Sequence, residues 1–537
     1  MVFTSLTFLI FALVLFFVYY LVPKKFQWIV LLVGSLLFYF YSGWKYFIFL
    51  IGTIISFYLL GLWLGHVSNK EENKIALLKE KIEDKEVFKE ERNKIRLKAN
   101  TLRKVICALG VVVALSALFL VKYFNFFGSI FTSLFLKDKA FAGLNLIVPI
   151  GLSFYLFSSM GYLIDVSRGV HQPEKNIFKF ALFVSFFPTV LQGPICTYSE
   201  LSNELYTGHE LSSENVRNGF RRVLFGFMKK VLIADLIGVA VSTVFNNSGD
   251  YHGFILFVII VFYAIQIYAD FSGYMDIAIG FAQMLGIKLP ENFDSPYLSR
   301  SISEFWRRWH ISLGAWFRNY LYYPLLRSKW LNRIKAGLSR KEKRRGDVFI
   351  TVVALGIVWI SIGLWHGASF NYLLYGCFHG FFVICDAVLS GVYKKTRKTL
   401  HINENSRIYR GFQIVRTFLI VCFGYFLFRA SSLSQTGYMI KETVRFWDWE
   451  QIINGTIFNL GIHWSIYLVV FGFILLAIFG NSLFLKPKAV TKIDLQNIIP
   501  TLIQYCVLII VCWSVVAGYI YAKSLGDIGS AFIYFEF

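Results

Sequence analysis

The chain is organised around one stretch, Asp270 to Gly380, whose centre reads Glu304-Phe305-Trp306-Arg307-Arg308-Trp309-His310. After a basic loop the stretch continues with Gly363-Leu364-Trp365-His366-Gly367-Ala368-Ser369-Phe370-Asn371. Each segment carries one histidine in or beside a long apolar run. Because an ionisable side chain at membrane depth is costly, both histidines are candidate functional residues.

The composition indicates a membrane protein. Of 537 residues, 56% are hydrophobic, 19% are aromatic and 16% are charged. Many windows exceed the roughly 18 to 20 apolar residues that span a bilayer. We therefore expect an all-α polytopic membrane protein with roughly 11 to 14 membrane-embedded helices, some of them re-entrant.

The formal net charge of +22 has a topological explanation. Lysine and arginine collect in short loops between apolar spans, as the positive-inside rule predicts, so nucleic acid is not an expected partner. Lys24 and Lys25 follow the first span, which places the N-terminus outside, and the count of spans places the C-terminus outside too. Seven cysteines form no CxxC pair, so we predict neither a metal site nor a disulfide.

Shifts in composition divide the chain into four parts. Residues 1–66 form N-terminal helices, and 67–104 form a charged cytoplasmic segment. Residues 105–430 form the core with both histidine segments, and 431–537 form C-terminal helices with an aromatic tail. Opposite charges at i,i+4 in the charged segment predict a solvated helix, with docking of a partner as the alternative role.

Two apolar segments contain residues that disfavour a simple span. Phe178 to Cys196 includes Phe187-Pro188 and Gln192-Gly193-Pro194, so we expect a broken or re-entrant segment that lines a cavity. Gly253 to Leu289 contains two carboxylates, which must be paired or face a cavity. These carboxylates are Asp270 and Asp276. Four basic residues precede the segment, and they either anchor a helix at the cytoplasmic surface or line an anionic pocket: Arg221, Arg222, Lys229 and Lys230.

Helical periodicity suggests which polar side chains lie together. Glu304 to Leu325 is amphipathic, and the i, i+4, i+7 spacing predicts that Trp306, His310 and Leu313 share one helical face. In the later span, the same spacing places three polar side chains on one face: Asn371, Tyr375 and His379.

The two central histidines fit acyl-transfer chemistry. A neutral imidazole can take a proton from a hydroxyl as that hydroxyl attacks a thioester, and a second polar group can hold the oxyanion. His310 and His366 supply two such groups, but the residues alone do not say which is the base. Two histidines that only bridge helices remain the alternative.

Several motifs resemble the membrane-bound O-acyltransferase superfamily, in particular its branch of bacterial alginate and peptidoglycan O-acetyltransferases. The resemblance covers most of the chain. It rests on Pro149-Ile150-Gly151-Leu152-Ser153-Phe154, Asp270-Phe271-Ser272-Gly273-Tyr274-Met275-Asp276, Pro290-Glu291-Asn292-Phe293, Glu304 to Leu313, Leu364-Trp365-His366-Gly367-Ala368 and Phe428-Arg429-Ala430.

The resemblance implies a ring of helices around a central funnel, with His366 catalytic and His310 as the second active-site histidine. We expect Trp306, Asp270 and Asn371 to line the cavity. The implied reaction takes acetyl groups from cytoplasmic acetyl-CoA, a substrate rather than a cofactor, across a bacterial plasma membrane. An extracytoplasmic acetyltransferase partner then modifies an envelope or secreted polysaccharide (peptidoglycan, alginate-like or cellulose-like).

The last six residues, Phe532-Ile533-Tyr534-Phe535-Glu536-Phe537, resemble an aromatic C-terminal acyl-transfer motif of envelope acylation systems. The resemblance makes Tyr534 the transient acyl acceptor, and an aromatic anchor at the membrane interface is the alternative. Two positions depart from the family pattern: Asn319 replaces a usual Asp, and Leu326-Arg327-Ser328 replaces a usual Gly-Gly.

Three other functions remain open from the sequence. A related branch transfers D-alanine to teichoic acid from a carrier-protein thioester. A transporter or channel would use the embedded carboxylates and histidines as a polar path. A scaffold for envelope enzymes would not need the histidines.

Overall fold

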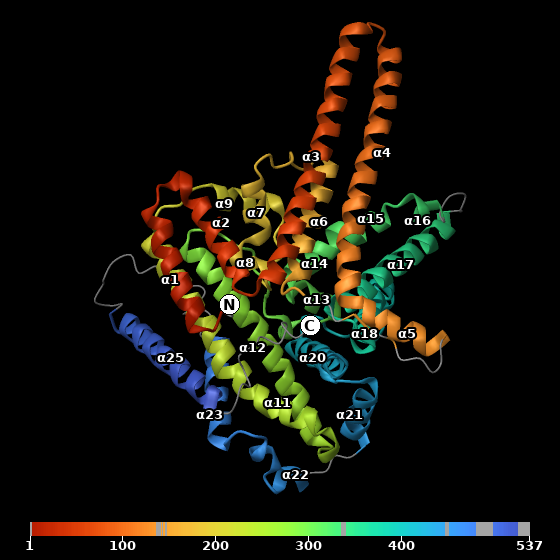
Figure 1. Cartoon of the computed structure of the whole chain (residues 1–537). Helices are drawn as coiled ribbons and strands as arrows, with labels where there is room; N and C mark the ends of the chain where they lie inside the picture. The colour runs from red at the N-terminus through yellow and green to blue at the C-terminus, as the bar shows by residue number, and fades with distance from the viewer. Residues whose placement is uncertain are drawn as a thin grey trace. The chain divides into compact units, whose positions relative to one another are not determined.

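A computed structural model of the chain describes residues 3–135, 141, 143–144, 148–333, 340–445, 450–479 and 498–524 (Figure 1). Every regular element in these ranges is a helix. Within them, six helices are long and apolar enough to cross a membrane, and three shorter helices are apolar. The expected all-α polytopic membrane protein is thereby confirmed. The count of 11 to 14 embedded helices and the central funnel stay predictions.

The chain forms two compact units, which cut across the four parts drawn from composition. The first contains residues 7–211 and 285–289, and the second contains residues 2–6, 212–284 and 290–537. The helices of the first unit are α1 (Leu6–Leu21), α2 (Lys24–Phe40), α3 (Trp44–Lys81), α4 (Lys85–Leu118), α5 (Phe124–Phe135), α6 (Leu152–Arg168), α7 (Ile177–Ser185), α8 (Phe187–Val190) and α9 (Tyr198–Tyr206).

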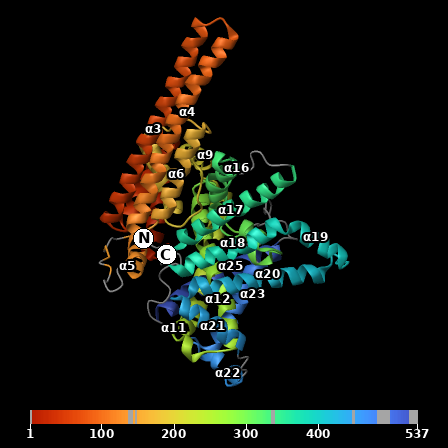
Figure 2. The same ribbon diagram turned by 90° about the vertical axis from the view of Figure 1, so that its right-hand side faces the viewer.

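The charged segment 67–104 is a helical hairpin and not the single helix that its charge pattern predicted. The charged ends of α3 and α4 run side by side and extend beyond the other helices of their unit (Figures 1 and 2). The turn between them ends at Asp84, whose carboxylate caps α4 by accepting the backbone N–H groups of Glu86 and Val87. Glu71 on α3 pairs with Arg103 on α4, so a charge pair also joins the two helices.

The segment Phe178 to Cys196 is broken, as its sequence predicts. Helix α7 ends at Ser185, the short α8 carries Pro188 in its first turn, and the chain then continues without regular structure. Part of the freed backbone is satisfied from α2, because the hydroxyl of Ser35 accepts the N–H of Phe187 at 3.1 Å. A cavity-lining role of this segment stays a prediction.

The second unit holds both histidine segments. Its helices are α10 (Ser213–Phe227), α11 (Leu236–Asn246), α12 (Phe254–Met284), α13 (Ile302–Arg308), α14 (Ile311–Phe317), α15 (Tyr323–Leu326), α16 (Lys329–Arg333), α17 (Arg340–His366), α18 (Phe370–Val388), α19 (Ser390–Thr399), α20 (Arg407–Arg429), α21 (Leu433–Arg445), α22 (Glu450–Ile453), α23 (Trp464–Phe479) and α25 (Ile498–Ser524). A π-helical segment, Met228–Asp235, joins α10 to α11.

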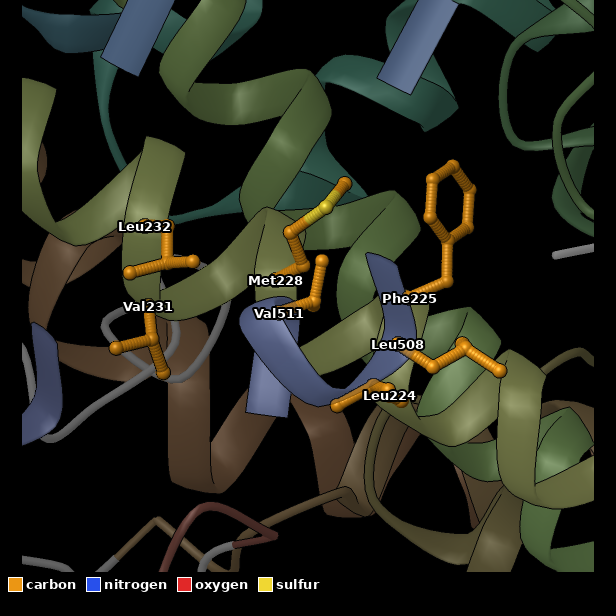
Figure 3. Packing of buried hydrophobic residues seen from close by; sticks show 7 residues of the cluster. All are labelled: Leu224, Phe225, Met228, Val231, Leu232, Leu508 and Val511. Atoms are coloured by element: carbon orange, nitrogen blue, oxygen red, sulfur yellow. The ribbon is translucent and has the colours of Figure 1, made fainter. Parts of the chain in front are cut away.

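Close packing of α10 on α12 depends on paired glycines. A Cβ at Gly226 would lie 2.6 Å from the carbonyl oxygen of Gly273, and one at Gly219 would lie 2.6 Å from that of Gly280. Small residues of this kind let helix backbones approach within a membrane. On α10, the π-helical segment and α25, apolar side chains form a buried cluster (Figure 3): Leu224, Phe225, Met228, Val231, Leu232, Leu508 and Val511.

Helices α17 and α18 form a second close pair, which holds the second histidine segment. A Cβ at Gly363 would lie 2.6 Å from the carbonyl oxygen of Tyr372, and one at Gly376 would meet the carbonyl oxygen of Trp359. The lack of a side chain at Gly363 and Gly376 therefore lets the backbones of α17 and α18 approach each other closely.

Replacing Gly376 with leucine is expected to destabilise the protein by about 3 kcal/mol or more, because the backbone of α17 cannot yield without displacing the helix. The same change at Gly356 of α17 is the matched control, since a Cβ there meets nothing within 4 Å. Thermal unfolding of both variants in detergent measures the difference. Equal midpoints for the two variants would contradict the packing assignment.

Candidate functional site

The chain around His310 is not the uninterrupted helix that periodicity predicted. Helix α13 ends at Arg308 and α14 begins at Ile311, and His310 lies between them at φ +47°. A non-glycine residue rarely adopts this left-handed conformation, so neighbouring contacts must stabilise it. The prediction that Trp306, His310 and Leu313 share one helical face is therefore wrong.

The contacts that break the helix come from the Pro290-Glu291-Asn292-Phe293 motif. Phe293 and Trp309 form an antiparallel bridge. The N–H of Ile311 donates to the backbone oxygen of Asn292 at 3.0 Å, and the N–H of Ser312 donates to its side-chain Oδ1 at 2.9 Å. These long-range hydrogen bonds replace those that a continuous helix would make. Asn292 belongs to a family motif in the sequence, but its residue type and position there do not indicate a role.

His310 is buried among aromatic rings. Its side chain is 1% exposed, and its ring centroid lies 4.8 Å from that of Phe271 and 5.8 Å from that of Trp365. Its Nδ1 lies 3.3 Å from Oδ1 of Asn292. Burial lowers the pKa of His310 to about 3, because the charged form loses hydration. The imidazole is therefore neutral at neutral pH.

His366 is the last residue of α17 and is also buried, at 3% exposure. Its ring centroid lies 5.0 Å from that of Trp365, 5.2 Å from that of Phe428 and 5.9 Å from that of Tyr375. The ring of Trp365 thus neighbours both imidazoles. The structure brings the two predicted histidines to one aromatic site, although the basic loop separates them in sequence.

A third histidine belongs to the same aromatic surroundings. Trp306 packs against Trp359 at 4.8 Å and against His379 at 5.1 Å between ring centroids. His379 shares the buried face of α18 with Asn371 and Tyr375, as the i, i+4, i+8 spacing predicts. Among the described residues, neither ring nitrogen of His379 has a hydrogen-bond partner. The sequence placed His379 on this face without a function.

Asn371 joins the start of α18 to the end of α20. Its Nδ2 donates to the backbone oxygen of Ala430 at 2.8 Å, and its side chain is buried. The Phe428-Arg429-Ala430 motif therefore meets the second histidine segment, because Phe428 packs on His366 and Ala430 accepts from Asn371. Cavity-lining roles for Trp306 and Asn371 stay predictions.

The two carboxylates of α12 are paired within the protein. Lys230 lies 2.7 Å from Asp270 and 2.8 Å from Asp235, and both of its pairs are almost fully buried. Lys229 lies 2.7 Å from Asp276, which also accepts from Arg222 at 3.0 Å. Arg222 also makes two hydrogen bonds to a fourth carboxylate, that of Glu291.

This network shows which groups the basic residues contact within the protein. The sequence offered surface anchoring or an anionic pocket for the basic residues of α10 and the π-helical segment. Arg222, Lys229 and Lys230 each pair with a carboxylate of their own unit, and their anchoring and pocket-lining roles stay predictions. Of the alternatives for Asp270 and Asp276, pairing is the one observed, and the cavity-lining role of Asp270 stays a prediction.

Two further predictions concern Tyr534 and metal binding. Tyr534 lies outside the described residues. No group of three or more histidine, cysteine or acidic side chains able to hold a metal ion occurs in the described part of the chain. Two imidazoles, those of His310 and His366, lie in apolar, aromatic surroundings, and an imidazole suits proton transfer and hydrogen bonding to a bound substrate.

Comparison with known proteins gives consistent matches. Residues 166–339 match the family model of MBOAT, the membrane-bound O-acyltransferase family. The probable alginate O-acetylase AlgI of Pseudomonas aeruginosa is 31% identical over 503 residues, covering 92% of this chain and 84% of the relative.

Two further relatives are a peptidoglycan and a teichoic acid transferase. The peptidoglycan O-acetyltransferase of Helicobacter pylori is 29% identical, covering 67% of this chain and 63% of the relative. The teichoic acid D-alanyltransferase of Bacillus subtilis is 28% identical, covering 53% of this chain and 69% of the relative.

Proposed function

The chain belongs to the membrane-bound O-acyltransferase family and is an acyltransferase, and from this premise we propose that it O-acetylates a polysaccharide of the cell envelope or a secreted one. Alginate and peptidoglycan O-acetyltransferases among its relatives support the acetyl group and the polymer class. The observation that carries the proposal is the meeting of His310 and His366 at the ring of Trp365.

The proposed roles come from the family resemblance, and the arrangement of the two histidines is compatible with them. His366 is the base that takes the proton of an attacking hydroxyl, while His310 orients the substrate or helps to stabilise the oxyanion. The apolar surroundings exclude water, which strengthens these polar interactions and protects a thioester from hydrolysis. The chain needs no cofactor for this chemistry, because the acyl donor is a substrate.

The donor and its side of the membrane are further parts of the proposal. Acetyl-CoA binds from the cytoplasm, where the basic loops attract an anionic donor. Both termini lie outside a bacterial plasma membrane, as the lysines after the first span suggest. An extracytoplasmic acetyltransferase partner completes the transfer to the polymer.

The transient acceptor of the acetyl group is Tyr534. Incubation with radiolabelled acetyl-CoA, followed by digestion, is expected to label the C-terminal peptide of the wild-type protein. Tyr534→Phe removes the hydroxyl and should remove this label, whereas Tyr521→Phe, a change in the preceding helix α25, should keep it. Turnover of acetyl-CoA without label on Tyr534 would contradict the carrier role but leave the enzyme intact.

Transfer of D-alanine to teichoic acid is the second candidate. The relative from Bacillus subtilis supports it over about half of this chain. Donor choice separates the two functions, because D-alanyl transfer in that branch uses a thioester on a carrier protein. Turnover of a D-alanyl carrier protein, with no turnover of acetyl-CoA, would favour this candidate.

A transporter is a weaker alternative for this chain. It depends on embedded carboxylates and histidines that form a polar path. Asp270 and Asp276 instead pair with Lys230 and Lys229, so their charges are compensated inside the protein. Substrate flux without covalent acyl transfer would favour the transporter.

A further inference from the structure

Asn292 has one possible orientation of its side-chain amide. The backbone N–H of Ser312 can only donate, and it lies 2.9 Å from Oδ1 of Asn292. A reversed amide would place two donors against each other. The Nδ2 group instead faces the sulfur of Met275 at 3.3 Å, which is a weak acceptor. The neighbours of Asn292 therefore assign oxygen and nitrogen without ambiguity.

The oriented amide determines the tautomer of His310. Oδ1 of Asn292 carries no hydrogen, so Nδ1 of His310, 3.3 Å away, must be the donor. A neutral imidazole has a single N–H, and it is used in this bond. Nε2 therefore holds a lone pair and can only accept a hydrogen bond.

The lone pair on Nε2 has no protein partner. Nε2 is buried, and among the described residues nothing donates a hydrogen bond to it. An unsatisfied buried acceptor costs free energy, and such groups are rare in folded proteins. Because His310 lies beside Trp365 and hence near His366, the natural donor is a molecule bound at this site.

We propose that Asn292 holds His310 in the neutral Nδ1–H tautomer, and that Nε2 of His310 accepts a hydrogen bond from an N–H or O–H group of the bound substrate. The proposal rests on the proposed acyl transfer and narrows it. In this tautomer His310 orients the substrate and does not donate to an oxyanion, which needs a hydrogen-bond donor. Asn292 is a positioning residue, because it acts through His310.

Two parts of the substrates carry the required donor. One is an amide N–H of the pantetheine arm that bears the thioester, and the other is the hydroxyl that receives the acyl group. Both present the same hydrogen-bonding chemistry to Nε2. Binding of the acyl donor, measured separately from transfer, distinguishes them.

The tautomer is measured without turnover. Nitrogen-15 spectra of the full-length protein, labelled in its histidine rings and held in lipid nanodiscs, distinguish an imidazole nitrogen with a proton from one with a lone pair. The pair of ring-nitrogen signals that disappears in the His310→Asn variant is assigned to His310. We expect a lone pair on Nε2 and a proton on Nδ1 of His310 at neutral pH. The reverse assignment would overturn the proposal.

Variants of Asn292 test its positioning role. Asn292→Leu removes the acceptor for Nδ1 of His310. We expect the rate of acyl transfer to fall about 10- to 100-fold, because a small misplacement of a group that orients the substrate has effects of this size. Asn292→Asp keeps an acceptor for both Nδ1 and Ser312, so it should keep the Nδ1–H tautomer. Its carboxylate should also shift the acid limb of the pH–rate profile to higher pH, because a negative charge raises a histidine pKa.

The matched control is Met275→Leu. It removes the sulfur beside Nδ2 of Asn292 while leaving the Oδ1 contacts intact, so both the tautomer and the rate should stay close to those of the wild type. A spectrum of Asn292→Leu that still shows the wild-type tautomer, with an unchanged rate, would overturn the role of Asn292.

Kinetics of His310→Asn identify the substrate group. Weaker binding of acetyl-CoA, by about 10-fold, would assign the bond to the donor's amide N–H. Unchanged binding with slower transfer would assign it to the acceptor's hydroxyl. Unchanged binding and transfer would overturn the proposal. Since the spectrum needs no turnover, a protein that transfers no acyl group would overturn the proposed function without altering the tautomer result.

Discussion

Replacing His366 with alanine is expected to lower the rate of acyl transfer by about 100- to 10,000-fold, the usual range for removal of a general acid–base residue. The expectation depends on its position at the end of α17, buried among Trp365, Phe428 and Tyr375. Transfer from radiolabelled acetyl-CoA by purified, reconstituted protein, with its partner present, measures the effect.

Two further variants separate chemistry from packing. His366→Gln keeps a polar side chain but cannot take the proton at the same site, so it should be nearly as impaired as the alanine variant. His379→Gln changes another buried histidine of the same helix pair and should retain most of the activity. Acyl transfer that survives in His366→Ala would contradict the role of His366 as the base. It would favour the alternative in which the histidines only bridge helices.

Replacing Lys230 with methionine is expected to destabilise the protein by about 3 to 5 kcal/mol, as when one partner of a buried ion pair is removed. Lys230 is the cation shared by Asp235 and Asp270, and all three side chains are almost fully buried. Asp270→Asn should cost less, because Lys230 retains Asp235. Thermal unfolding in detergent measures this order.

Removal of all three charges is the internal control for this prediction. Lys230→Met combined with Asp235→Asn and Asp270→Asn leaves no buried charge of the triad, so stability should recover in part. Lys441→Met, at an exposed position on α21, should leave the unfolding midpoint unchanged. If Lys230→Met also leaves the unfolding midpoint unchanged, the buried ion pairs of Lys230 do not stabilise the protein.

Much of the site could be predicted from residue chemistry and spacing. The sequence points to the histidines at positions 310 and 366, because ionisable groups are costly in apolar segments. The break at Pro188 and the shared face of Asn371, Tyr375 and His379 followed from local backbone rules. The family resemblance then indicated acyl transfer, which similarity to known acyltransferases supports.

One failure involves a long-range contact that competes with local preference, and the other involves a local helix cap. Periodicity predicted a continuous helix through His310, but Asn292 supplies hydrogen bonds that stabilise a left-handed residue there. The charged segment predicted one helix, but Asp84 caps a second one and turns the chain into a hairpin. Asn292 cannot be recognised as a partner from the pattern around His310, whereas an Asp such as Asp84 is a local signal for the start of a helix.

The sequence by itself determined the membrane class, the helical content and the two histidines, because hydrophobicity and backbone periodicity are properties of neighbouring residues. Only the tertiary structure decided that Lys230 pairs with Asp270, that Trp365 neighbours both imidazoles, and that Asn292 directs the proton of His310. These features join residues far apart in the chain, and the free energy of such contacts exists only after the helices have packed.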